Sequence, residues 1–227
     1  MSDSIRFYRK YLMNYLFLFV LLFFSCQQSP QNAKVLQGTS SNPFMDIKPI
    51  ASPKNFGEKL SNAALQVIDS SVVYTPDYVA LRYPGGDVPP KTGVCTDVVI
   101  RAYRKCAIDL QKEVHEDMQV HFERYPTIKK WGLKTTDKNI DHRRVPNLEV
   151  FFSRKGKKLA LSNNPSDYLP GDIVTWLVNG KLPHIGIVTH IKKEGIPMIV
   201  HNIGGGQIIE ACLFKYPMVG HFRYDGK

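Results

Sequence analysis

Three residues of the chain carry side chains suited to nucleophilic chemistry: Cys95, His184 and His201. Cys95 follows a segment rich in glycine and proline, 83–93, and begins a segment, 95–108, whose apolar residues recur at helical spacing. A helix N-terminus offers free N–H groups and partial positive charge, which lower the pKa of a thiol and can bind a developing oxyanion. Cys95 is therefore a candidate nucleophile, and a small buried apolar residue is the alternative interpretation.

The candidate base for this thiol is His184, which begins a predicted strand over 184–190. A strand fixes the direction of a side chain, and a catalytic histidine also needs a partner for its second ring nitrogen. The next predicted strand, 198–202, offers His201 and Asn202. Neighbouring residues of a strand point to opposite faces, so only one of the two can face His184, and we favour His201.

The elements that would hold these side chains change type along the chain. Helical periodicity, or a proline at a helix start, predicts helices over 56–67, 95–108, 111–125 and 146–152. Runs rich in β-branched residues predict strands over 172–178, 184–190, 198–202, 207–213 and 218–224, with a hairpin signal at Asn179-Gly180. Helices first and an antiparallel meander second predict an α+β fold.

The beginning of the chain has the pattern of an export signal. A basic stretch at 6–10 precedes an apolar run over 11–24, which is too short to span a membrane. The run ends at Ser25-Cys26, which resembles the processing site of a bacterial lipoprotein, so Cys26 is a candidate for lipidation. We expect a lipoprotein on the periplasmic face of a bacterial membrane, with a soluble periplasmic protein as the alternative.

The rest of the 227 residues divides into a tether and one domain. We expect a signal peptide over 1–26, a flexible tether rich in Ser, Gln, Asn and Pro over 27–55, and a folded domain over 56–227. The formal net charge of +10 suggests nucleic-acid binding at first sight. The basic residues are scattered, no nucleic-acid motif is present, and export removes that partner. We therefore expect no nucleic-acid ligand.

The sequence around the candidate site resembles a known group of proteins. Gly93-Val-Cys-Thr-Asp97, then Gly171-Asp-Ile-Val174, then His184-Ile-Gly-Ile-Val188, resemble the NlpC-type papain-like peptidases of bacterial cell walls. The resemblance implies helices packed on an antiparallel sheet, a Cys95–His184 pair, a third polar residue on the following strand, and a tyrosine near the oxyanion, here Tyr83. Thr96-Asp97 replaces the usual Ser-Gly, and a long insertion separates the helices from the sheet.

Longer strings resemble one subfamily of that group. They are 83-YPGGDVP-89, 93-GVCTDVVIRAY-103, 115-HEDM-118 and 139-NIDHRRVPN-147. This subfamily is the one known as domain of unknown function 1287. Its name implies no substrate.

The resemblance implies a hydrolase acting on peptidoglycan. The Cys95 thiolate would attack an amide carbonyl, His184 would act as base and then acid, and His201 would orient it, through a thioester intermediate. The bond would be a D,L-peptide bond or the muramoyl-L-alanine amide. The alternative is a non-catalytic module of the same fold that binds peptidoglycan. The oligomeric state stays open.

Several further residues are candidates for binding the substrate or the oxyanion. They are Tyr83, Thr96, Asp97, Asn202 and Arg143. Arg143 lies in the insertion, where it could grip a carboxylate of a peptide stem or form internal ion pairs in a solvated polar loop. No closely spaced ligand motif is present, so we expect no metal and no cofactor. Cys106 and Cys212 could form a disulfide or stay as free thiols.

Overall fold

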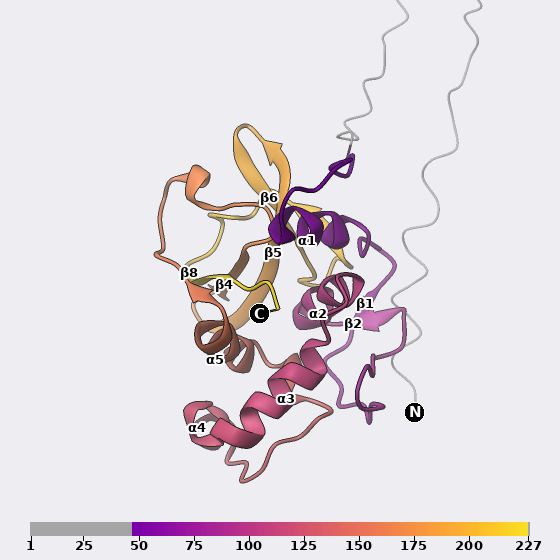
Figure 1. The fold of residues 1–227 in the computed structure, drawn as a ribbon, viewed down its shortest axis with the longest axis vertical. Helices are drawn as coiled ribbons and strands as arrows, with labels where there is room; N and C mark the ends of the chain where they lie inside the picture. The colour runs from indigo at the N-terminus through magenta and orange to yellow at the C-terminus, as the bar shows by residue number, and fades with distance from the viewer. Residues whose placement is uncertain (1–46, 227) are drawn as a thin grey trace, which may run out of the picture. The chain divides into compact units, whose positions relative to one another are not determined.

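The computed structural model describes residues 47–226 and is built on a six-stranded antiparallel sheet with strand order β3-β8-β4-β5-β6-β7 (Figure 1). The strands are β3 (Lys157–Lys158), β4 (Ile173–Val178), β5 (Leu182–Lys193), β6 (Ile196–His201), β7 (Ile208–Glu210) and β8 (Met218–Arg223). A separate parallel pair joins β1 (Val73–Tyr74) to β2 (Thr92–Gly93). Mixed helices and an antiparallel sheet agree with the α+β prediction.

Five α-helices precede or interrupt the strands. They are α1 (Phe56–Leu65), α2 (Cys95–Lys105), α3 (Leu110–His121), α4 (Thr127–Trp131) and α5 (Val145–Lys155). Short 3-10 helices are η1 (Phe122–Arg124), η2 (Asp141–Arg143) and η3 (Pro165–Asp167). The four predicted helices are present as α1, α2, α3 and α5. The insertion is not merely irregular: it holds α4 and η2, and the three residues of η2 are buried.

The hairpins follow from residues that adopt left-handed backbone conformations. Asn179 and Gly180 have φ of 51° and 70° between β4 and β5, and Glu194 and Gly195 have φ of 53° and 82° between β5 and β6. Such turns match the twist of paired strands. β4, β5, β6 and β7 form the predicted meander, but β8 does not continue it. It returns to pair with β4. Periodicity in the sequence identifies a strand but not its partner, so this pairing was not predicted.

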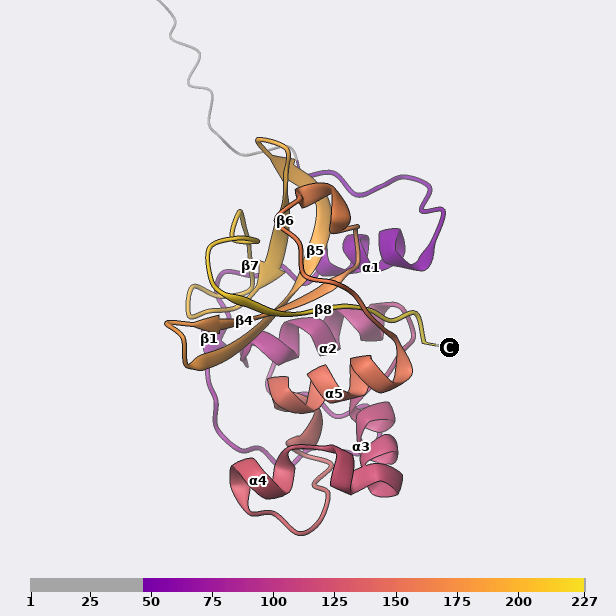
Figure 2. The ribbon, with the colours of Figure 1, turned by 90° about the vertical axis from the view of Figure 1, so that its left-hand side faces the viewer.

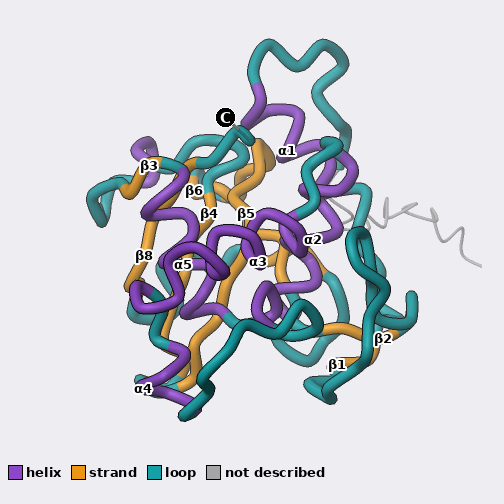
Figure 3. Tube along the Cα trace, turned by 60° about the horizontal axis from the view of Figure 1, so that its bottom comes forward, coloured by secondary structure: helices purple, strands orange, loops and turns teal. Residues whose placement is uncertain are grey.

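The helices cover one face of the sheet. α1, α2 and α5 all pack against β5, and α5 also contacts β8 (Figure 2). In Figure 3, α2 and α5 lie in front of the strands, with β1 and β2 beside α2. The core between the helices and the sheet includes Val98 and Val99 of α2 and Ile185 of β5, all of them fully buried. Trp176, Ile199 and Cys212 belong to a second apolar cluster.

The folded domain begins before residue 56. Asn62 of α1 accepts a hydrogen bond from the Ile50 amide and donates one to its carbonyl, both at 2.8 Å. The Lys48 carbonyl lies 2.9 Å from Nε2 of His190 on β5. The end of the predicted tether, at residue 55, is therefore placed too late. The predicted signal peptide, Cys26 and residues 27–46 lie outside the described residues, and no helix within 47–226 is long and apolar enough to cross a membrane.

Candidate functional site

Cys95 is the first residue of α2, where helix geometry leaves backbone N–H groups without helical partners. Its sulfur is buried and interacts with the backbone N–H groups of Thr96 and Ile185 and with the hydroxyl of Tyr74. Burial raises the pKa of the Cys95 thiol to about 11, with a smaller contribution from the Asp97 carboxylate, while these three donors oppose the rise. The resting thiol is therefore protonated at neutral pH.

His184 takes part in a chain of hydrogen bonds that runs away from Cys95. Its Nε2 lies 2.8 Å from Nδ1 of His201, and Nε2 of His201 lies 3.2 Å from Oε2 of Glu210. The other carboxylate oxygen of Glu210 accepts a hydrogen bond of 2.6 Å from the Lys215 ammonium. His201, and not Asn202, thus faces His184. We call these four side chains, His184, His201, Glu210 and Lys215, the relay.

The small size of Gly186 lets the two histidines meet. Residues 186 and 201 lie opposite each other in the register that pairs Ile187 with Val200 on β5 and β6. A Cβ at Gly186 would lie 2.5 Å from the Ile199 side chain and 3.2 Å from Cβ of His201. The glycine of the His-Ile-Gly-Ile-Val string therefore makes room for β6 to bring His201 against His184.

The relay determines which nitrogen of His184 can act as a base. The Lys215 ammonium, followed by His201, holds the pKa of Glu210 below its usual value, so Glu210 is an acceptor. Its partner His201 must then carry its proton on Nε2 and accept at Nδ1 from the Nε2–H of His184. The Nδ1 of His184 is left with a free lone pair. Burial, with a smaller effect from His201, lowers the pKa of His184 to about 3, so the ring is neutral.

The thiol lies against the start of β5, the strand that also carries His184. Ile185, whose amide faces the Cys95 sulfur, directly follows His184 in the chain. The hydrogen bonds within residues 47–226 do not include one between the Cys95 sulfur and His184. Cys95 is therefore a neutral thiol and His184 a neutral imidazole, and the two do not form a hydrogen-bonded ion pair in this part of the chain.

A tyrosine beside the thiol was not predicted. Burial, followed by the adjacent Cys95, raises the pKa of Tyr74 to about 12, so its hydroxyl stays protonated as a donor. Tyr74 reaches the thiol because β1 pairs with β2, which places Tyr74 opposite Gly93. The predicted Tyr83 instead packs its ring 5.2 Å from the His115 ring. Spacing along the chain selected Tyr83, whereas the tyrosine beside the thiol is Tyr74. The sequence signal for Tyr74 was the short β-type run 72–74 that ends in it.

Thr96, Asp97 and Arg143 form a buried lock between the insertion and α2. The Arg143 guanidinium binds Asp97 through two hydrogen bonds of 2.9 and 3.1 Å, and both side chains are 2% exposed. The Thr96 hydroxyl donates to the Arg143 carbonyl at 3.1 Å, and Asp97 also accepts from the Val94 amide at 2.7 Å. These groups are occupied inside the protein. The predicted contacts of Thr96 and Asp97 with substrate are corrected to a role in holding the first turn of α2, and Arg143 forms the internal ion pair that was its alternative interpretation.

Asn202 is likewise used inside the protein. Its Nδ2 donates to the Gly93 carbonyl at 3.4 Å, and its Oδ1 accepts from the Gly204 amide at 3.0 Å. Asn202 therefore ties the end of β6 to the loop before Cys95, and the predicted binding role is corrected in the same way.

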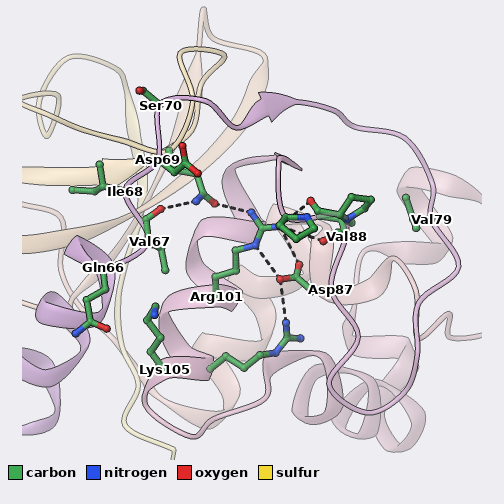
Figure 4. Close-up of a pocket in the computed structure, with 14 residues that line it drawn as sticks. Gln66, Val67, Ile68, Asp69, Ser70, Val79, Asp87, Val88, Arg101 and Lys105 are labelled. Atoms are coloured by element: carbon green, nitrogen blue, oxygen red, sulfur yellow. Dashed lines mark hydrogen bonds and ion pairs between the residues drawn. The ribbon is translucent and has the colours of Figure 1, made fainter.

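A pocket of about 1230 Å³ lies along the opposite end of α2 (Figure 4). Arg101 crosses its floor and binds Asp87 at 3.0 Å and Gln207 at 3.0 Å. Arg104 and Lys105 add positive charge, and valine and proline side chains supply apolar surface. None of the residues that line this pocket is Cys95 or a member of the relay.

The cysteines within residues 47–226 are free thiols: Cys95, Cys106 and Cys212. The predicted alternative of a Cys106–Cys212 disulfide is therefore absent from this part of the chain. Cys212 is buried with its sulfur 3.6 Å from Nε2 of His201. His201, Glu210 and Cys212 bring nitrogen, oxygen and sulfur donor atoms within 4.8 Å of one another.

Comparison with known proteins identifies the family of this chain. A family model described as a domain of unknown function (DUF1287) matches residues 61–224. A protein of Escherichia coli (strain K12), named "Uncharacterized protein YijF", is 54% identical over 166 residues, which cover 73% of this chain and 80% of that protein. No solved structure matches significantly. The matched segment contains Cys95 and the whole relay, and the chain belongs to the DUF1287 family.

Proposed function

We propose that this chain is an exported cysteine hydrolase with an NlpC-type papain-like fold, which cleaves an amide bond of peptidoglycan. One observation carries the proposal. A thiol at the first residue of α2 interacts with the Ile185 backbone of β5, and the preceding residue of β5 is a histidine whose relay leaves Nδ1 free to act as a base. A nucleophile, a base and an orienting group are the parts that covalent acyl transfer requires.

The reaction would begin with attack by the Cys95 sulfur on the amide carbonyl carbon, while the thiol proton passes to Nδ1 of His184. Free N–H groups of the first turn of α2 and the Tyr74 hydroxyl would stabilise the oxyanion. The protonated His184 would then give its proton to the leaving amine, and a thioester would remain. Water would attack the thioester with His184 again as base.

Burial of the thiol affects the order of these events. With the pKa of Cys95 raised to about 11 and that of His184 lowered to about 3, proton transfer before attack is unfavourable. Proton transfer would therefore accompany the attack, as it does for a hydroxyl nucleophile. His201 and Glu210 would act as positioning residues, because they act on the substrate only through His184.

The charge of the surroundings suits an anionic polymer. The pocket along α2 is lined by Arg101, Arg104 and Lys105 against Asp69 and Asp87, an excess of one positive charge, and peptide stems of peptidoglycan carry carboxylates. The basic stretch and apolar run before Cys26 support export and a lipid anchor, with soluble periplasmic location as the alternative. Peptidoglycan is accordingly the proposed partner.

The test is mass spectrometry of defined muropeptides incubated with the full chain. The wild-type protein should release one new fragment, whose mass identifies either a D,L-peptide bond or the muramoyl-L-alanine amide as the cleaved bond. Cys95→Ser and Cys95→Ala should lose this activity while keeping the circular dichroism spectrum and melting temperature. Cys106→Ala is the matched control for loss of a thiol and should keep full activity. Undiminished cleavage by Cys95→Ala would sink the proposal.

A second candidate function is non-catalytic binding of peptidoglycan. The observation that favours it is the buried, protonated Cys95, together with a charged pocket that excludes the candidate catalytic groups. This function predicts that sacculi sediment with the protein equally before and after alkylation of its thiols, without release of fragments. Lys105→Glu should then weaken sedimentation, since Lys105 is an exposed cation of the pocket.

A further inference from the structure

Three potential metal ligands converge at the far end of the relay. Nε2 of His201 lies 3.2 Å from Oε2 of Glu210 and 3.6 Å from Sγ of Cys212. His201 and Cys212 are at most 1% exposed, whereas the Glu210 side chain is 31% exposed and gives a path from solvent. The group combines one imidazole, one carboxylate and one thiol, all from β6, β7 and the residues just after β7.

The separations of the Glu210 oxygen and the Cys212 sulfur from His201 Nε2 match those of a tetrahedral zinc site. Zinc binds nitrogen at about 2.0 Å, oxygen at about 2.1 Å and sulfur at about 2.3 Å, so tetrahedral ligands lie about 3.4 Å apart for nitrogen and oxygen and about 3.6 Å for nitrogen and sulfur. The distances to His201 are 3.2 and 3.6 Å. The third separation, between the Glu210 carboxylate and the Cys212 sulfur, is no more than 4.8 Å, so side-chain movement would bring all three atoms onto one ion.

We propose that His201, Glu210 and Cys212 form a binding site for a divalent cation of the zinc type, and that its occupation switches off His184 as a base. The second half of this inference depends on the proposed hydrolase function, whereas the first half does not.

The donor set selects the class of metal. A thiolate and an imidazole suit zinc and exclude calcium and magnesium, which take oxygen ligands. Lys215 binds Oε1 of Glu210 and leaves Oε2 turned toward His201, so only one carboxylate oxygen is available as a ligand. Three protein ligands leave the fourth position to water on the exposed side of Glu210. The Cys212 proton would leave to solvent as the sulfur binds the ion.

A bound ion reverses the proton arrangement of the relay. In the metal-free relay His201 carries its proton on Nε2 and accepts at Nδ1 from His184. A metal occupies the lone pair of Nε2, so the proton of His201 must move to Nδ1 and be donated to Nε2 of His184. The proton of His184 then resides on Nδ1, the nitrogen that would accept from Cys95. Metal binding and proton abstraction are therefore mutually exclusive.

The binding test uses the full chain carrying Cys95→Ala, so that the nucleophile cannot act as a ligand. Zn²⁺ is titrated by calorimetry, and Co²⁺ is added separately to detect thiolate-to-cobalt charge-transfer absorption. One equivalent of Zn²⁺ should bind, and Co²⁺ should give the thiolate absorption. Adding Cys212→Ala should weaken binding at least tenfold and remove the absorption, whereas adding Cys106→Ala, the matched control, should change neither.

Glu210→Gln provides a second variant if Cys212→Ala does not fold, as judged by metal-free circular dichroism. It should weaken Zn²⁺ binding and keep the thiolate absorption at higher Co²⁺ concentration. Absence of stoichiometric binding overturns the site, and so does binding that is unchanged by Cys212→Ala.

The switch is tested separately on muropeptide cleavage. Zn²⁺ should reduce wild-type activity at least tenfold, and a chelator should restore it. Cys212→Ala should keep its own metal-free cleavage rate at the Zn²⁺ concentration that inhibits the wild type. Equal inhibition of both overturns the switch. If the metal-free protein shows no hydrolase activity, the proposed function is contradicted. The calorimetric titration then still decides whether the metal site exists.

Discussion

The cysteine end and the histidine end of the candidate site are held in different ways. Cys95 is surrounded by backbone N–H groups, and the turn that carries it is held by a buried ion pair between Asp97 and Arg143. His184 is held by a chain of side chains that ends at the half-exposed Glu210 and at Lys215. The first arrangement is part of the core, and the second reaches solvent. Loss of the ion pair at the cysteine end should therefore affect stability, and changes at the histidine end should affect proton transfer.

The largest expected effect is on stability, from Arg143→Met. This change leaves the Asp97 carboxylate buried without its cation, which costs about 3–5 kcal/mol of the free energy of unfolding. Urea denaturation followed by circular dichroism measures it. Lys112→Met, which breaks the exposed Lys112–Glu116 pair, is the matched control and should leave the midpoint unchanged. If Arg143→Met and Lys112→Met both change the urea midpoint only slightly, the cysteine end is not held by its buried ion pair.

Next in size is the effect of Glu210→Gln on turnover. Glutamine keeps the shape but removes the charge that sets the proton on Nε2 of His201. We expect kcat to fall roughly tenfold to hundredfold. This is less than most losses of a general base itself, because Glu210 acts only through His201 and His184. Nitrogen NMR of the histidine rings should show a changed tautomer of His201, which a merely structural role would not produce. An unchanged tautomer and rate would place Glu210 outside the relay.

Tyr74→Phe should have a smaller effect, because it removes one of several donors to the sulfur. The Tyr74 hydroxyl lowers the pKa of Cys95, so its loss should shift the alkylation profile of this thiol to higher pH. Activity should fall about tenfold if the hydroxyl also serves the oxyanion. Tyr83→Phe is the control and should change neither quantity, since Tyr83 packs on His115. An effect of Tyr83→Phe on both quantities, with none from Tyr74→Phe, would show that Tyr83 is the tyrosine that serves the thiol.

The last effect, on stability, appears only at alkaline pH. The folded pKa of Cys95 is about 11, above the unfolded value of about 8.5, so the folded state keeps this proton where the unfolded state has lost it. The stability from Cys95 is complete below the unfolded pKa and is lost as pH rises toward 11. Cys95→Ala should flatten this loss in urea midpoints measured between pH 8 and 10.5. An identical slope in the variant would contradict burial of the thiol.

Much of the fold could be predicted from local patterns. The Asn179-Gly180 turn and the β-branched runs located the strands, and helical spacing located α1 and α2, because both signals depend on neighbouring residues. The pairing of β8 with β4 could not be predicted in this way. It depends on contacts between residues some 45 positions apart, which leave no local period.

The candidate site divides along the same line. Cys95 stood out because its helix start is a local feature, and His201 because alternation along a strand puts only one of two neighbours on the required face. Asp97 and Arg143 were candidates for contact with substrate, and internal ion pairs were the alternative for Arg143. Their burial comes from each satisfying the other across 46 positions. Glu210 and Cys212 carried no signal, since neither forms a spaced motif.

By itself the sequence determined that a thiol begins a helix, that two histidines lie on consecutive strands, and that the chain belongs with proteins carrying the same strings. Only the tertiary structure decided which tyrosine meets the thiol, which charges cancel each other, and which carboxylate and sulfur complete the surroundings of His201. The reason is physical. Local patterns report the preferences of the backbone, whereas proton positions and ligand sets depend on atoms that only packing brings within about 4 Å.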